Sequence, residues 1–186
     1  GGLKMETREC IKTRRSIRRF TEQPIPDEVL NELLDAVRWA PSWANTQCWE
    51  VVVVKDPDTR QKLVEALAPN NPATKGVAGA PVNLVMCARR GTSGYKKGEL
   101  TTNRGDWGMF DVGIAAQNLC LAAHDLGLGT VHVGLINHQA VDELLGLPSD
   151  VESLEIIPVG YPEKVGNAPP RKELSEFVHW DKYGNK

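Results

Sequence analysis

The residues with the clearest chemical meaning lie near the start of the chain, where four arginines and one serine fall within six positions, Arg14 to Arg19. In an extended chain, side chains alternate between two faces, so Arg14, Ser16 and Arg18 would share one face. Two guanidinium groups beside a hydroxyl suit a dianionic phosphate better than a carboxylate or a metal ion. The segment therefore indicates a phosphorylated small ligand. A solvated basic stretch is the simpler interpretation of these residues taken alone.

A second polar segment, Pro41 to Trp49, contains two amides, two hydroxyls and two indoles. Its two amide residues, Asn45 and Gln47, each offer a hydrogen-bond donor and an acceptor. That combination matches the edge of a heterocycle that carries both carbonyls and ring nitrogens. A turn-forming connector with packing tryptophans is an equally good interpretation.

Motifs for other kinds of chemistry are missing from the sequence. No GxGxxG follows an expected strand, and neither GxxxxGK[ST] nor GxSxG occurs. The four histidines lack the spacing of metal ligands, so no metal site is expected. Ser42 and Cys48 have no identifiable base partner, and no side chain is predicted to be catalytic.

The elements that must position these segments follow from hydrophobic periodicity and turn residues. Helices are expected at 5–13, 27–40, 56–67, 110–126 and 139–145, and strands at 50–54, 82–88, 130–133 and 154–159. Loops are expected at 69–79 and 89–108, followed by a polar tail at 161–186. The helix at 110–126 is rich in Ala and Gly, which predicts close packing at the centre of the fold. Strands that alternate with helices would ordinarily favour a parallel sheet.

Length and composition limit the class of protein. The chain has 186 residues, and residues 5–186 fit a single domain, whereas Gly1 to Lys4 precede Met5 and resemble a remnant of an expression vector. The net charge of −2 argues against a nucleic-acid partner. No run approaches the roughly 20 apolar residues that span a bilayer, and no signal peptide is expected. With four scattered cysteines, a cytoplasmic location and no membrane partner are the expectation.

Taken together, these segments resemble the nitroreductase family of flavin mononucleotide (FMN) enzymes. The resemblance rests on an ordered series of motifs that covers nearly the whole chain: Arg14 to Phe20; Ala40-Pro41-Ser42 with Asn45, Gln47 and Trp49; Gly127 to Gly134; Pro158 to Pro162; and Pro169 to Lys172.

The resemblance implies an α+β fold with three α/β/α layers, a mixed and mainly antiparallel central sheet, and an intertwined homodimer. It also implies two FMN molecules at the subunit interface. The residues implied to hold FMN are Arg14, Arg15, Ser16, Arg18, Pro41, Ser42, Trp43, Asn45, Gln47, Lys75, Val133, Gly134, Leu135 and Arg171. Among these, Arg14, Ser16, Arg18 and Arg171 would hold the phosphate and the ribityl hydroxyls. The segment from Pro41 to Asn45 would reach the flavin from the other subunit.

A bound flavin would also explain why acid–base motifs are missing, because the cofactor carries the chemistry. The expected reaction is ping-pong: NAD(P)H, a transient co-substrate, reduces FMN, and a small electron-poor acceptor such as a nitroaromatic or quinone reoxidises it. Trp43, Tyr95 and Trp107 are the predicted walls of the substrate pocket. Two alternatives stay open: a specialised flavin enzyme that dehalogenates its substrate or fragments flavin, and a non-enzymatic protein that binds or stores FMN.

Overall fold

The apolar run after Pro81 forms β2 (Val82–Arg89), the strand around which the sheet is built. In the computed structural model, which describes residues 5–186, β2 pairs with β1 (Trp49–Val54) and with β6 (Val151–Gly160). A short strand, β5 (Gly129–Thr130), pairs with the far side of β6, so the order is β1-β2-β6-β5. The predicted vector remnant at 1–4 lies outside the described residues.

All pairs in this four-stranded sheet are antiparallel, so the parallel arrangement that strand–helix alternation favours is wrong. One isolated bridge, between Ser16 and Thr130, is parallel and adds the arginine segment to the edge of β5. The sheet is therefore mixed and mainly antiparallel, as the family resemblance implies. Alternation alone failed because the helical connections from β1 to β2 and from β5 to β6 each return the chain in the opposite direction.

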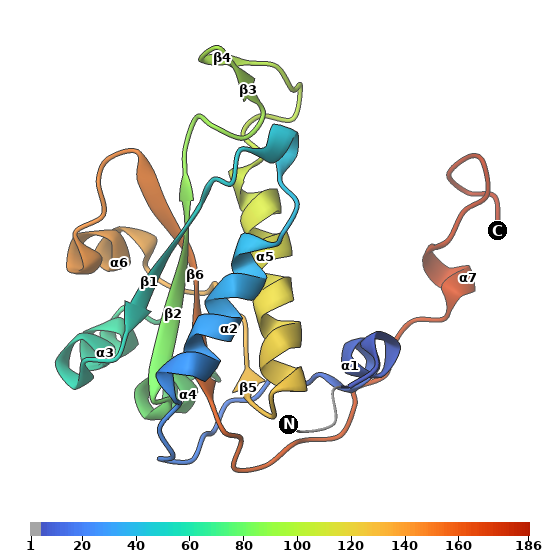
Figure 1. Ribbon diagram of the computed structural model, residues 1–186. Coiled ribbons are helices and arrows are strands. Elements are labelled where there is room, and N and C mark those ends of the chain that lie inside the picture. Colours follow the sequence, from blue (N-terminus) through green and yellow to red (C-terminus); the bar gives the residue numbers. More distant parts are fainter. Residues whose placement is uncertain (1–4) are drawn as a thin grey trace.

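Helices cover both faces of the sheet and make three layers (Figure 1). The helices of one face are α2 (Asp27–Arg38) and α5 (Gly108–Asp125), and those of the other are α3 (Pro57–Glu65), α4 (Thr74–Gly79) and α6 (His138–Leu145). Side chains of β2 alternate between the layers: Leu84 and Met86 pack with α2 and α5, whereas Val85 and Cys87 pack with the other three helices. The predicted three-layer fold is confirmed.

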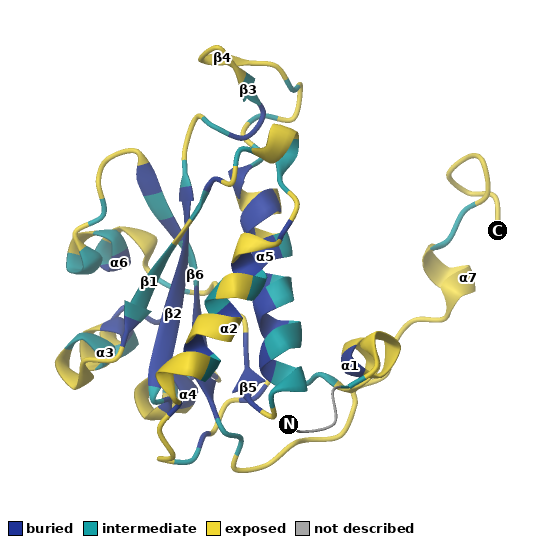
Figure 2. Cartoon of the chain, viewed as in Figure 1, coloured by how far each residue is buried: buried dark blue, intermediate teal, exposed yellow. Residues whose placement is uncertain are grey.

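Helix α5 is the central helix that its small residues predict. Ala115, Ala116 and Ala123 are fully buried, and Figure 2 shows the buried side of α5 turned toward the sheet. Helix α2 buries Leu30, Leu33 and Val37 at helical spacing and stops before Pro41.

Two predicted loops contain regular structure. The segment 69–79 ends in α4. Asn71 starts this helix, because its side-chain oxygen accepts from the Ala73 amide and its carbonyl accepts from the Thr74 hydroxyl. Burial of Val77, which is complete, holds the helix on the sheet. The segment 89–108 carries a small hairpin of β3 (Tyr95–Lys96) and β4 (Glu99–Leu100). Its glycines and polar residues gave no strand periodicity in the sequence. The expected strand 130–133 stops at Thr130.

The two ends of the chain differ in how they pack on the layers. Helix α1 (Thr7–Thr13) packs beside the end of α5, whereas α7 (Leu174–Phe177) lies well away from the layers (Figure 1). Among residues 5–186, the last hydrogen bond from the tail to the body is donated by the Glu163 backbone amide to the Arg19 carbonyl. Among residues 5–186, no helix has the length and apolar character that crossing a membrane requires.

Candidate functional site

The arginine segment is extended and anchored by its apolar residues. The Ile17 amide donates to the Thr130 carbonyl over 2.8 Å, and Ile17 and Phe20 form a small buried cluster with Ala80. Ser16 and Arg18, on either side of Ile17, are exposed. The structure thus gives Ser16 and Arg18 the shared outward face that alternation predicts.

Arg14 supplies the most informative atom of this segment. The side chain is half-buried, and its Nη1 atom is buried with no hydrogen-bond partner among residues 5–186. A buried guanidinium N–H without a partner is costly, and it is well suited to an anion that enters from outside. Arg14 lines a cavity of about 240 Å³ together with Arg15, His124 and Thr130.

Arg15 has a structural role as well. Its Nη1 donates to the carbonyl oxygens of Lys12 and Arg14, at 2.7 and 2.8 Å. These carbonyls lie at the C-terminal end of α1, where backbone acceptors lack helical partners. Arg15 therefore closes α1 while it also borders the cavity.

The segment after Pro41 is a tight turn with unusual backbone angles. Trp43–Asn45 form a single 3₁₀ turn, and φ is positive at Ala44 (47°), Asn45 (56°) and Gln47 (50°). Non-glycine residues reach this region only when the surroundings hold them there. Here the backbone N–H of Gln47 donates to Ser42 Oγ at 2.9 Å, and this hydrogen bond joins the two ends of the turn.

Asp111 is the second support of this turn. The carboxylate is almost fully buried in the first turns of α5, and its Oδ2 accepts a 3.0 Å hydrogen bond from the Trp43 amide. The same oxygen accepts a hydrogen bond from Ser93 Oγ, and Ser93 Oγ also contacts Thr46 Oγ1. Asp111 thereby links the Trp43 turn to the 89–107 segment, which carries Ser93.

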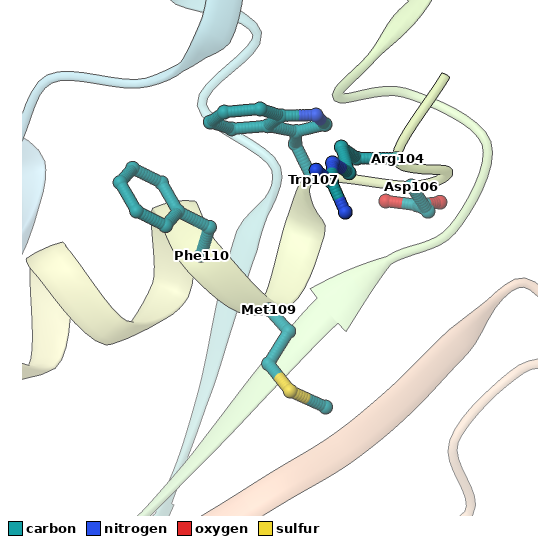
Figure 3. A pocket seen from close by; sticks show the side chains of 5 residues that line it. All are labelled: Arg104, Asp106, Trp107, Met109 and Phe110. Carbon is teal, nitrogen blue, oxygen red and sulfur yellow. The ribbon is translucent and has the colours of Figure 1, made fainter. Parts of the chain in front are cut away.

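The predicted wall residues are only partly brought together. Trp107 lines a cavity of about 420 Å³ with Arg104, Asp106, Met109 and Phe110 (Figure 3). Trp107 and Phe110 meet edge to face, with centroids 5.0 Å apart. An adjoining cavity of about 200 Å³ is lined by Trp107 and by residues on either side of it, Pro41, Ser42, Trp43, Phe110, Asp111 and Ile114. Tyr95, on the hairpin, lines neither cavity.

The segment that the resemblance implies to hold FMN through Val133, Gly134 and Leu135 continues from β5. Val133 exchanges two 3.0 Å backbone hydrogen bonds with Ile156, which fixes its position at the edge of β6. Gly134 is exposed, and its amide makes no hydrogen bond among the described residues. The Leu135 carbonyl accepts from Asn71 Nδ2 at 3.1 Å, so the segment is held on both sides of Gly134.

His132 precedes this segment and bridges two elements. Its Nε2 lies 3.5 Å from Cys120 Sγ in α5, and its Nδ1 lies 2.8 Å from Glu155 Oε2 in β6. These hydrogen bonds to Cys120 and Glu155 raise the pKa of His132 to about 10. His132 is therefore a cation near neutral pH, at the edge of the candidate site.

Lys75 lies on a helix that packs on the arginine segment, whereas Arg171 stands apart from that segment. Lys75 is exposed on α4, whose next residue, Gly76, packs on the Arg18 backbone: a Cβ at Gly76 would lie 3.2 Å from the Arg18 carbonyl oxygen. Arg171 is exposed in the tail, and its hydrogen bonds within residues 5–186 go to the carbonyls of Pro169 and Pro170. Within one chain, Arg171 is not brought to Arg14.

The two halves of the candidate site lie at opposite ends of α5. Arg14 borders the cavity shared with His124, in the last turn, whereas Trp43 is bonded to Asp111, near the first. Thirteen residues of helix separate Asp111 from His124, a rise of about 20 Å. A single chain therefore presents an arginine-lined cavity and an aromatic cavity that are far apart.

Comparison with known proteins identifies the fold. The sequence profile described as the Nitroreductase family matches residues 11–161. The chain belongs to the nitroreductase family. Among its relatives, an FMN reductase [NAD(P)H] from Bacillus subtilis is 33% identical, over 97% of this chain and 76% of the relative. An NADPH-flavin oxidoreductase from Vibrio harveyi is 34% identical, over 95% of this chain and 74% of the relative.

The crystal structure of nitroreductase A from Vibrio parahaemolyticus superposes with a TM-score of 0.83 at 34% identity. The alignment covers 98% of this chain and 78% of that one. The α+β architecture is thus that of solved nitroreductases.

Three residues that border the candidate site in this nitroreductase fold are not predicted from the sequence. Asp111 could have been found, since a carboxylate in an apolar helix needs a partner. Ser93 lies in a segment without periodicity and gave no signal. His124 falls in the last turn of the helix expected at 110–126, but nothing in the sequence shows that it meets Thr13 and the arginines.

Proposed function

We propose that this nitroreductase family member is an NAD(P)H-dependent oxidoreductase that holds FMN between two copies of the chain. The observation that carries the proposal is the separation of the anion site and the aromatic turn along α5. A flavin that touches both kinds of residue needs the arginine segment of one chain and the Trp43 turn of another. The names of the relatives, which include FMN reductases and flavin oxidoreductases, support the same cofactor.

The residues at the arginine end fit the phosphate of FMN. Arg14 has a buried N–H that finds no partner within the described part of the chain, and Ser16 and Arg18 share an exposed face beside it. We expect these groups to bind the phosphate and the ribityl hydroxyls. Arg15 contributes positive charge from the cavity wall, and Arg171 joins the site when the tail is placed against the partner subunit.

The flavin ring would be held by backbone and by the partner subunit. The free amide of Gly134 is the expected donor to the ring, flanked by Val133 and Leu135, and Lys75 is the expected cation at the pyrimidine edge. The second chain would contribute Pro41, Ser42, Trp43, Asn45 and Gln47.

When bound, FMN would supply the redox chemistry of a ping-pong reaction between NAD(P)H and a second substrate in one pocket. The side chains of this protein supply the surface on which both substrates stack. Trp43 and Trp107 line adjoining or shared cavities beside Phe110. Such walls suit flat, electron-poor acceptors, and we propose nitroaromatics and quinones.

Exposed apolar side chains are a second observation that supports a dimer. Large apolar side chains are exposed directly after α2 and in the first turn of α5: Trp39, Met109 and Phe110 are exposed by 74, 70 and 59%. The tail also exposes Leu174, Phe177 and Trp180. Exposed apolar area of this extent is typical of an interface. We propose a homodimer in which the tail lies on the partner subunit.

The test is an anaerobic absorbance spectrum of the purified protein before and after addition of NADH or NADPH. The proposal predicts flavin bands that bleach within the mixing time and return when a quinone or a nitroaromatic is added. A protein that binds FMN but does not bleach would instead be a storage protein or a specialised flavin enzyme. A protein that fails to bind added FMN would contradict the proposal.

A further inference from the structure

The cavity beside Arg14 contains a titratable group that the proposed FMN contacts leave unused. His124, in the last turn of α5, lines this cavity together with Arg14 and Arg15. The imidazole is half-buried, and it is brought there by a contact between α5 and the end of α1. The inference drawn from it rests on the proposed function.

The hydrogen bonds around His124 identify its basic nitrogen. Thr13 Oγ1 lies 2.7 Å from the Glu9 carbonyl, to which it donates its only proton. The same oxygen lies 2.8 Å from His124 Nε2, so Nε2 must be the donor of that contact. Nδ1 is therefore the atom that gains or loses the proton, and none of the hydrogen bonds within residues 5–186 uses it.

The charges around His124 come from three elements. Burial and the guanidinium groups of Arg14 and Arg15 lower the pKa of His124, and Asp125, its neighbour in α5, opposes them. From α1, Cys10 also lies near Arg14 and Asp125, and burial raises the pKa of its thiol, so it stays neutral. With only these groups around it, His124 is neutral near pH 7.

A phosphate in the same cavity would reverse this balance. Two guanidinium groups repel a third cation, but a dianion among them attracts one. We propose that His124 is a further cationic ligand of the FMN phosphate, beside the arginines, and that phosphate binding is coupled to the uptake of one proton from solvent at His124 Nδ1. By linkage, the affinity for FMN must then weaken as the pH rises. The loss approaches about tenfold for each unit by which phosphate raises the pKa of His124.

Calorimetry of FMN binding to the flavin-free protein tests this coupling. Titrations at pH 7.5 in two buffers of different ionisation enthalpy give the number of protons taken up. We expect uptake by the unaltered protein and its loss in His124→Gln. His138→Gln is the matched control, because His138 bonds the Ser153 carbonyl on the opposite helical layer. Riboflavin, which has no phosphate, should bind without this uptake.

The outcomes separate the two proposals. Equal proton uptake in His124→Gln and the unaltered protein would overturn the role of His124 and leave FMN binding intact. A protein that does not bind FMN at all would overturn the proposed function and this inference together. If His124→Gln does not fold, NMR titration of the unaltered protein decides. The His124 pKa must then be higher with FMN than without it, and an unchanged pKa overturns the proposal.

Discussion

Gly129 lies directly under Ile17, so close that a Cβ at position 129 would come within 2.6 Å of Ile17 Cγ1. The contact explains how the arginine segment is seated. Ile17 fills the space that the missing side chain of Gly129 leaves, and its amide bonds the Thr130 carbonyl. Ser16 and Arg18 then face outward on either side.

Gly129→Ala should therefore displace the arginine segment. We expect a loss of about 1–3 kcal/mol of unfolding free energy from overpacking, together with weaker FMN binding. Thermal and denaturant unfolding measure the first effect, and a flavin fluorescence titration measures the second. Gly113→Ala is the control, because a Cβ there meets nothing within 4 Å. Unchanged stability of Gly129→Ala would mean that the segment is not seated by this contact.

Arg14→Ala should weaken FMN binding by about 1.5–3 kcal/mol, since it removes a charge-assisted contact. The stability of the flavin-free protein should change little, because Arg14 Nη1 has no partner among residues 5–186. Arg38→Ala serves as the control, because Arg38 pairs with Asp35 on the surface of α2. Equal FMN retention by both variants would exclude Arg14 from the phosphate site.

Asp111→Ala should release the Trp43 turn. It leaves the Trp43 amide and the Ser93 hydroxyl without their acceptor, at a cost of about 1–3 kcal/mol for each group that stays buried. Hydrogen exchange should speed up at Trp43 to Gln47 and around Ser93, while the β2 amides stay protected. Asp111→Asn keeps one acceptor oxygen and should recover part of the protection. A turn that stays equally protected in the alanine variant would show that Asp111 does not hold it.

Deletion of residues 177–186 should weaken dimerisation if the tail lies on the partner subunit. The deletion removes the exposed side chains of Phe177, Trp180 and Tyr183, which contribute apolar area only when another surface covers them. Sedimentation velocity over a range of concentrations measures the dissociation constant. A constant equal to that of the full chain would place the tail in solvent.

His132 should give the protein a stability that depends on pH. Its pKa is raised to about 10 in the folded chain, above the ordinary value of 6.5. The contribution is therefore complete below about pH 6.5 and is lost as the pH rises toward 10. His132→Gln should narrow the difference in stability between pH 6.5 and pH 9.5, as measured by denaturant unfolding. A variant with the same pH profile as the unaltered protein would show that His132 is not the titrating group.

The sequence pattern predicted the elements that bury a continuous apolar face and missed those held by single polar contacts. Helix α2 and strands β1 and β2 follow directly from their periodicity. Helix α4 has six residues and depends on the Asn71 turn and on burial of Val77, neither of which periodicity reveals.

The same division applies to the candidate site. The shared face of Ser16 and Arg18 follows from the two-residue repeat of an extended chain. The contacts of Asp111 with Trp43 and of His124 with Thr13 join positions 68 and 111 residues apart, so they exist only in the folded chain. The pairing of antiparallel strands is non-local in the same way.

The hydrogen bonds that hold the arginine segment on the sheet have a consequence for synthesis on the ribosome. Ile17 and Thr21 bond the carbonyls of Thr130 and Tyr161, which are made more than a hundred residues later. In a nascent chain whose β5 and β6 have not yet emerged from the ribosome, the arginine segment lacks the carbonyls to which it bonds. Because such distant contacts form late in folding, the cofactor cannot assist the early steps. Flavin loading should follow the synthesis and folding of β5 and β6.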